Sequence, residues 1–143
     1  MKLVAGDEFQ DAPKFTLGSA KTKLGSWLDR GLPYYSGSAA YEKEFEIPVR
    51  YAGRKLTLEC GEVGVVAEVL VNGKPAGTRV WLPFAFDITD LVKPGKNTVK
   101  ILVTNTMENE RAVDNHARRL PRLAHSGLIG PVSIRAGAPV ATR

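Results

Sequence analysis

Apolar and polar residues alternate along the middle of the chain, from Leu56 to Ile88. Within this stretch, residues 63–71 place a valine or alanine at every second position, a period typical of an extended strand. The other face is only partly polar, which favours a strand inside a sheet over one at its edge. Asn72-Gly73 follows directly, and because both residues tolerate positive φ the pair predicts a tight hairpin turn. We expect this strand and its turn at the centre of the fold.

Further alternating segments flank this central strand. Period-two apolar positions predict strands at 40–47, 55–60, 84–88, 99–103 and 132–136. Residues 1–25 are expected to add one or two short strands, and Thr89–Val92 to form one helical turn. Because short alternating strands are joined by turns and no long helical period occurs, the sequence predicts an all-β fold, an antiparallel β-sandwich or barrel.

Composition narrows the function classes. At 143 residues and 43% hydrophobic content, the chain is expected to form one domain with a full core. The net charge is +5, but lysines and arginines are interspersed with acids through most of the chain, which argues against nucleic-acid binding. No apolar run approaches the ~20 residues that span a bilayer. The single cysteine, Cys60, is in phase with Leu56 and Leu58 and is expected to be a buried hydrophobe.

Two loops carry the candidate chemistry. The Gly-, Pro- and Ser-containing segment 25–37 holds three large aromatics, more than a solvated loop needs. The segment 105–126 is long and polar, and it contains both histidines and several arginines. Long ordered loops in compact domains are often functional.

An ordered series of short motifs points to a family. In chain order these are Ser26-Trp27, Gly31–Gly37, YEKEF at 41–45, 61–63, 67–74, 83–89, NTVKILVTN at 97–105 and SGLIGPV at 126–132. The series resembles the sugar-binding jelly-roll domain of glycoside hydrolase family 2 and related α-L-rhamnosidase-like enzymes. It covers about residues 24–136. The resemblance implies a galactose-binding-domain-like sandwich spanning 1–143, with its ends (1–23 and 137–143) outside the match. The tail at 137–143 is expected to be frayed, as chain ends often are. It also implies that catalysis occurs on a separate (β/α)₈ barrel.

The same resemblance places both loops near a catalytic pocket. Aromatic rings stack on the apolar face of a sugar, and amide, imidazole and guanidinium groups bind its hydroxyls. An arginine cluster suits an anionic sugar such as a uronate. The predicted substrate-binding residues are Trp27, Tyr34, Tyr35, Asn115, His116, Arg118 and His125. We expect Trp27→Ala or Tyr35→Ala to weaken glycan binding while the fold persists.

Structural interpretations compete at several of these positions. Trp27 and one tyrosine could instead plug the end of the sandwich, and the second loop could be solvated until it meets a partner domain. Tyr41 is in phase with Phe45 and is interpreted as core. Trp81 is a core residue or a platform, with core favoured.

Metal and catalytic sites are not predicted. His116 and His125 are nine residues apart, which does not suit a helical zinc pair, and no cofactor is expected. Asp7, Glu8 and Asp11 are weak candidates for a structural calcium, since they lack the spacing of a calcium loop. The available carboxylates do not form a recognisable catalytic pair; they are Glu62, Glu68, Glu108, Glu110 and Asp114.

The sequence thus predicts a non-catalytic carbohydrate-binding module, an accessory domain of a glycoside hydrolase that binds an oligo- or polysaccharide. One alternative is a structural domain that docks on the catalytic domain of a parent glycosidase without sugar affinity of its own. Another is a polyanion binder using Arg111, Arg118, Arg119 and Arg122. The start of the chain lacks the apolar region of a signal peptide. The resemblance favours a secreted or periplasmic location within a larger enzyme over a cytoplasmic one.

Overall fold

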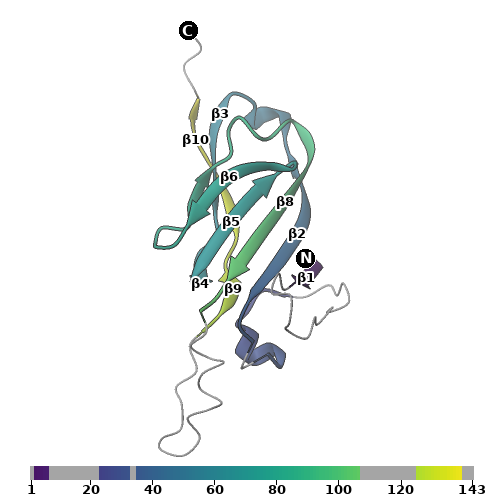
Figure 1. The fold of residues 1–143 in the computed structure, drawn as a ribbon. Helices are drawn as coiled ribbons and strands as arrows, with labels where there is room; N and C mark the ends of the chain where they lie inside the picture. Colours follow the sequence, from purple (N-terminus) through teal and green to yellow (C-terminus); the bar gives the residue numbers. More distant parts are fainter. Residues whose placement is uncertain (1, 7–22, 33–34, 107–124, 140–143) are drawn as a thin grey trace, which may run out of the picture.

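Antiparallel strands form two facing layers (Figure 1). The computed structural model describes residues 2–6, 23–32, 35–106 and 125–139. A five-stranded sheet has the order β1-β2-β8-β5-β6, a three-stranded sheet has the order β10-β3-β7, and β4 pairs with β9. The strands are β1 (Lys2–Gly6), β2 (Ser38–Ile47), β3 (Arg54–Glu59), β4 (Glu62–Gly64), β5 (Val66–Val71), β6 (Lys74–Arg79), β7 (Ala85–Asp87), β8 (Gly95–Thr104), β9 (Gly127–Gly130) and β10 (Ser133–Pro139). The prediction of an all-β sandwich is confirmed.

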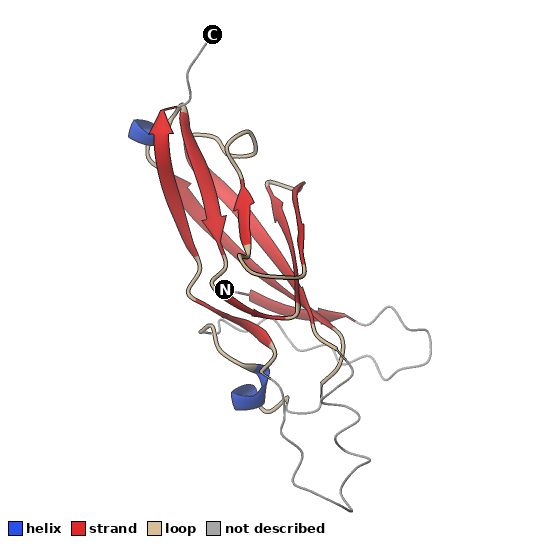
Figure 2. Ribbon diagram, turned by 90° about the vertical axis from the view of Figure 1, so that its left-hand side faces the viewer, coloured by secondary structure: helices blue, strands red, loops and turns tan. Residues whose placement is uncertain are grey.

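Two short 3₁₀ helices lie at opposite ends of the molecule (Figure 2). η1 (Trp27–Arg30) begins where the Ser26 hydroxyl accepts a hydrogen bond from the Leu28 N–H, and it ends at Gly31 with φ 76°. η2 (Val49–Tyr51) follows Pro48 at the end of β2. Neither helix in the described part of the chain is long enough to cross a bilayer.

Rows of apolar side chains fill the space between the layers. In an antiparallel sheet, directly opposed residues share a face. Val69 lies opposite Ile101, which in turn lies opposite Tyr41, and all three are buried. The facing sheet contributes Leu56, Leu58, Phe86 and Ile88 to the same cluster. Tyr41 is therefore core, as predicted.

The central strand differs from its prediction at one residue. β5 lies between β8 and β6, so it is an inner strand, and Asn72 (φ 51°) and Gly73 (φ 78°) form the predicted turn. However, the alternating run is not one strand. Val65 has φ 104° and divides it into β4, which pairs with β9, and β5 in the large sheet. The chain thus passes from one sheet to the other at this residue.

Cys60 is fully buried at the end of β3. Desolvation raises the pKa of its thiol to about 12, so it stays protonated at neutral pH. The prediction of a buried, hydrophobe-like cysteine is confirmed.

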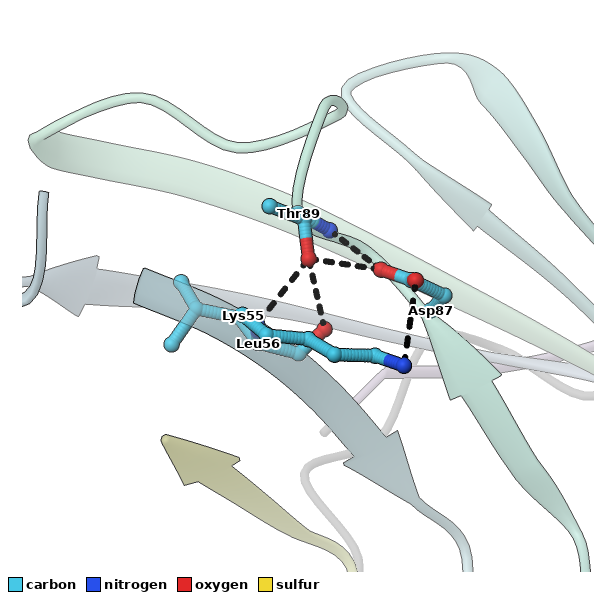
Figure 3. A network of polar contacts seen from close by, with 4 residues as sticks. All are labelled: Lys55, Leu56, Asp87 and Thr89. Atoms are coloured by element: carbon cyan, nitrogen blue, oxygen red, sulfur yellow. Dashed lines mark hydrogen bonds and ion pairs between the residues drawn. The ribbon is translucent and has the colours of Figure 1, made fainter. Parts of the chain in front are cut away.

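Thr89 and Asp87 join β7 to β3 at the end of the sandwich that carries η2 (Figure 3). The Thr89 hydroxyl donates to Asp87 Oδ1 at 2.6 Å, and the Leu56 N–H donates to Thr89 Oγ1 at 3.0 Å. The side-chain and backbone hydrogen bonds from Thr89 lower the pKa of Asp87, with Lys55 adding a weaker effect. The Leu91 N–H donates to the Ile88 carbonyl and closes a single turn here, without a helix.

Thr89→Val is expected to lower the free energy of unfolding by about 1–2 kcal/mol, because the Leu56 N–H loses its acceptor. A depressed folded-state pKa of Asp87 stabilises the fold above the unfolded pKa of about 3.9, and this contribution disappears as pH falls through the folded pKa. The valine variant should therefore lose less stability below about pH 4 than the parent does. Urea unfolding at neutral and acid pH measures both effects, with Thr78→Val on exposed β6 as the control. Equal acid sensitivity of parent and variant would contradict this role.

Candidate functional site

The two loops predicted to bind sugar start and finish at one end of the sandwich (Figure 1). The first loop leads into β2 at Ser38, and the second leaves β8 at Thr104. Ser38 and Thr104 are paired across the two strands, and their hydroxyls are 2.6 Å apart. Val66, the first residue of β5, is also paired with Thr104. This loop end is opposite to the end that carries η2.

Asn105 joins the loops where the second one starts. Its side-chain oxygen accepts from the Gly37 N–H at 2.9 Å, and its side-chain nitrogen donates to the Tyr35 carbonyl at 2.7 Å. Its own N–H donates to the Gly37 carbonyl at 3.1 Å. One amide side chain therefore fixes the first residue of the second loop against the last residues of the first.

Two further backbone hydrogen bonds join the loops where the second one finishes. The Trp27 N–H donates to the Ser126 carbonyl at 2.9 Å, and the Gly25 N–H donates to the Leu128 carbonyl at 3.0 Å. Both ends of the 105–126 segment are thus attached to the 25–37 segment. The fold holds the bases of the two candidate loops side by side.

Asn105→Ala is expected to lower the free energy of unfolding by about 1–3 kcal/mol, because the half-buried Gly37 and Tyr35 backbone groups lose their partners. Thr106→Ala, at the exposed neighbouring position, should change it by less than about 0.5 kcal/mol. Chemical denaturation of both variants makes the comparison. Equal effects at the two positions would rule out the role of Asn105 as a link between the loops.

Trp27 lies in the core, and its predicted role as a stacking platform is wrong. The side chain is 1% exposed, and its indole N–H donates to the Tyr41 hydroxyl at 2.7 Å. The same hydroxyl accepts from the Leu128 N–H at 3.2 Å, and the Tyr35 ring packs edge-on at 5.2 Å. A sugar cannot reach a ring enclosed in this way. The alternative, in which Trp27 and a tyrosine plug the end of the sandwich, accounts for these contacts.

Other predicted residues have different positions. Tyr35 is half-buried, and its hydroxyl donates to the Ser38 carbonyl at 2.9 Å, while His125 is exposed at the base of the second loop. Several predictions fall outside the described residues: Tyr34, Asn115, His116 and Arg118 of the site, the alternative arginines at 111, 119 and 122, and the weak calcium candidates at 7, 8 and 11. Among the described residues, no cluster of His, Cys, Asp or Glu could hold a metal ion.

Trp81 is exposed, so its interpretation as a core residue is wrong. The side chain is 79% exposed, between Val80 at 45% and Leu82 at 76%. These residues follow β6, whose last residue, Arg79, is paired with Ala67 near the start of β5. The segment therefore leaves the large sheet at the loop end. It supplies an accessible aromatic face where the buried Trp27 does not.

A sequence model of the family described as "Glycosyl hydrolase 2 galactose-binding domain-like" matches residues 33–136. The chain belongs to this family. The match begins in the first loop and extends into β10, so it includes strands β2 to β9 and the whole second loop, while β1 and η1 precede it. The resemblance seen in the sequence motifs is confirmed.

Relatives of the domain are much longer than this chain. A putative β-glucuronidase of Formosa agariphila is 41% identical over 92 residues, which are 61% of this chain and 8% of that protein. A β-galactosidase of Thermoanaerobacter pseudethanolicus is 32% identical over 80 residues, 53% of this chain and 11% of that protein. The structure of a rhamnosidase from Novosphingobium sp. PP1Y superposes with a TM-score of 0.72 at 35% identity, covering 92% of this chain and 14% of that one. In these proteins the galactose-binding-like domain is a small part of a glycosidase.

Proposed function

We propose that this galactose-binding-like domain is a non-catalytic accessory domain of a glycoside hydrolase and that it contacts carbohydrate at the loop end. The observation that carries the proposal is the arrangement of that end. The family match covers strands of both facing sheets. The bases of the two loops are held together because Asn105 Oδ1 accepts a hydrogen bond from the Gly37 N–H and the Ser126 carbonyl accepts one from the Trp27 N–H. Loops fixed on a rigid β-scaffold are the usual place for binding residues.

An acidic sugar is the class of ligand that fits best. Four of the similar proteins carry the name β-glucuronidase, two of them as putative, and a glucuronide presents a carboxylate. The chain has a net charge of +5, and four of its arginines lie in the 105–126 loop. Guanidinium groups bind carboxylates in a planar, bidentate manner. We therefore propose uronate-containing oligosaccharides as the first ligands to test.

Trp81 and His125 are the described residues proposed to touch the glycan. Both are exposed, and both belong to segments that leave the strands at the loop end. An indole face that is already accessible can stack on a pyranose without rearranging the core. Tyr35 is proposed to position the first loop, since its ring packs on Trp27 and its hydroxyl holds Ser38.

Calorimetric titration of the 143-residue chain with glucuronate-containing oligosaccharides tests the proposal. Trp81→Ala should weaken binding about tenfold, which corresponds to about 1.4 kcal/mol. Val49→Ala, an equally exposed apolar position at the opposite end, should leave the affinity unchanged. Equal affinities of parent and Trp81→Ala would remove Trp81 from the site. The absence of glycosidase activity towards aryl glucuronides is expected throughout, and turnover by the isolated domain would overturn its non-catalytic role.

A second candidate is a docking domain without sugar affinity of its own. The exposed run Val80-Trp81-Leu82 favours it, because contiguous apolar surface on a soluble domain often marks an interface. A glycan array separates the two functions. Binding to acidic glycans supports the carbohydrate-binding domain, and a blank array together with an unaltered fold supports the docking domain.

A further inference from the structure

A mainly apolar groove opens between the two sheets on the side of β2 and β10, and its lining also includes Lys23, Lys43, Glu46 and Ser133. It has a volume of about 640 Å³. Phe45 and Ile47 of β2 form one wall, and Val132 with Ile134 and Ala136 of the β10 segment form the other. Both walls belong to the margins of their sheets, because β10 is the outer strand of the three-stranded sheet and β2 is next to the short outer strand β1.

Half of β2 has an open backbone edge in the described part of the chain. β8 pairs with all ten residues of β2, from Ser38 to Ile47. On the other side, β1 pairs only with Ser38–Glu42. Among the residues that the structure describes, no strand pairs with the N–H and C=O groups along the outer side of Lys43–Ile47, and such an edge can accept another strand. This open edge runs along the mouth of the groove.

The side chains of the open edge have a distinct charge pattern. Lys43 is in phase with Tyr41, Phe45 and Ile47, so it lies on the face directed towards the facing sheet, and it lines the groove. Glu44 and Glu46 alternate with these residues and are exposed. A lysine on the inner face of an edge disfavours strands that bring no anion to meet it. The edge therefore selects its partner by charge as well as by shape.

A second copy of this chain does not fit the edge. Antiparallel self-pairing centred on Phe45 would place Glu44 opposite Glu46 twice, and directly opposed like charges are destabilising. The other margin of the large sheet, β6, is protected differently. It carries Lys74, Pro75 and a bulge in its pairing with β5, features that discourage strand addition.

We propose that the open half of β2 binds an extended segment of the glycosidase outside this domain, added as an antiparallel strand that covers the groove. Opposed residues share a face, so the segment carries apolar residues opposite Ile47 and Phe45, basic residues opposite Glu46 and Glu44, and an acidic residue opposite Lys43. The similar rhamnosidase has 86% of its length outside the matched part, from which such a segment can come. The identity of the partner rests on the accessory role proposed above, whereas the binding edge itself does not require any sugar.

A synthetic peptide that carries this pattern tests the edge directly. The probe is fluorescein-labelled Ser-Val-Lys-Val-Lys-Glu-Ser-amide, and its matched control, Ser-Val-Glu-Val-Glu-Lys-Ser-amide, reverses every charge. In anisotropy titrations with the 143-residue chain, the control should bind about tenfold more weakly than the probe, because three opposed pairs become like-charged. Hydrogen exchange should slow at residues 43–47 when the probe is bound, and it should not change along β6.

A charge reversal at Lys43 in the protein tests the predicted pairing at a single position. Lys43→Glu should weaken binding of the probe about threefold. The same variant should bind about threefold more tightly a second peptide, in which the glutamate of the probe is replaced by lysine. Ile134→Asp, on the opposite wall of the groove, should weaken the binding of both peptides. Equal binding of probe and reversed-charge control would overturn the proposal, as would no binding at about 1 mM protein or protection confined to other strands. The peptide titration contains no sugar, so it tests the binding edge alone. If the chain binds the probe but no glycan, the carbohydrate-binding role is rejected and the binding edge is retained.

Discussion

Replacing Trp27 by alanine is expected to lower the free energy of unfolding by about 3–5 kcal/mol, a large part of the stability of a domain of this size. The indole is 1% exposed, and its removal leaves a cavity beneath the Tyr35 ring. It also removes the N–H that donates to the Tyr41 hydroxyl. We therefore expect much of the variant to be unfolded under conditions in which the parent chain is folded.

Trp81 provides the matched control for this prediction. Trp81→Ala removes the same side chain from a position that is 79% exposed, so it should change the free energy of unfolding by less than about 0.5 kcal/mol. Urea unfolding followed by far-ultraviolet circular dichroism compares the two variants without relying on tryptophan fluorescence. Similar losses of stability for both would contradict the assignment of Trp27 to the core and of Trp81 to the surface.

Gly127→Ala is expected to lower the free energy of unfolding by about 3 kcal/mol or more, which corresponds to a fall in Tm of about 10 °C. Gly127 has φ 94°, a backbone conformation that costs an L-residue about 1–2 kcal/mol. In addition, a Cβ at this position would lie 2.5 Å from Trp27 Nε1, closer than any real contact. The added methyl group forces the indole, the Gly127 backbone or both to move.

A control at Gly95 separates the cost of the backbone conformation from the cost of the collision with Trp27. The φ of Gly95, 92°, is almost the same, but a Cβ there would meet no atom within 4 Å. Gly95→Ala should therefore show the backbone cost alone, about 1–2 kcal/mol. Thermal unfolding of both alanine variants gives the difference, which measures the collision with Trp27. If the two losses of stability are equal, the close approach of Gly127 to the indole has no energetic consequence.

Alternation along the sequence was enough to predict the strands whose two faces differ. β2, β3 and β8 have apolar residues at alternate positions, interrupted in β2 by Lys43, because one face meets the facing sheet, as Leu56 and Leu58 do in β3. Strands that depend on their neighbours were missed. β6 contains a proline and a glycine, and it is held by pairing with β5. β9 begins and ends with glycine, and it is held by pairing with β4, where the missing side chain of Gly64 leaves room for the Ser126–Gly127 backbone.

The division at Val65 could not be predicted from the pattern. A valine with φ 104° carries no sequence sign, because β-branched residues ordinarily avoid this region. The period-two pattern therefore predicted a single strand where the structure has β4 and β5. The change of sheet at this residue is a tertiary effect, set by pairing of β4 with β9 on one side and of β5 with β8 on the other.

The two tryptophans show the limit of sequence reasoning about the site. Both lie in loops with glycine or proline nearby, and composition does not tell which one the tertiary structure encloses. Trp27 is buried because Tyr41, 14 residues later, and Gly127, a hundred residues later, come together around it. The sequence motifs did identify the family and the two loops, since these depend on local order along the chain.

The most direct test of the account is the footprint of an acidic glycan on the folded domain. In a titration of the ¹⁵N-labelled 143-residue chain with a glucuronate-terminated disaccharide, backbone NMR signals should shift at the loop end, including Trp81, Thr106 and His125. Signals of Val49–Tyr51, at the opposite end, should stay in place. Shifts confined to the opposite end or to the strands, or no shifts at about 10 mM disaccharide, would contradict the claim that the loop end contacts carbohydrate.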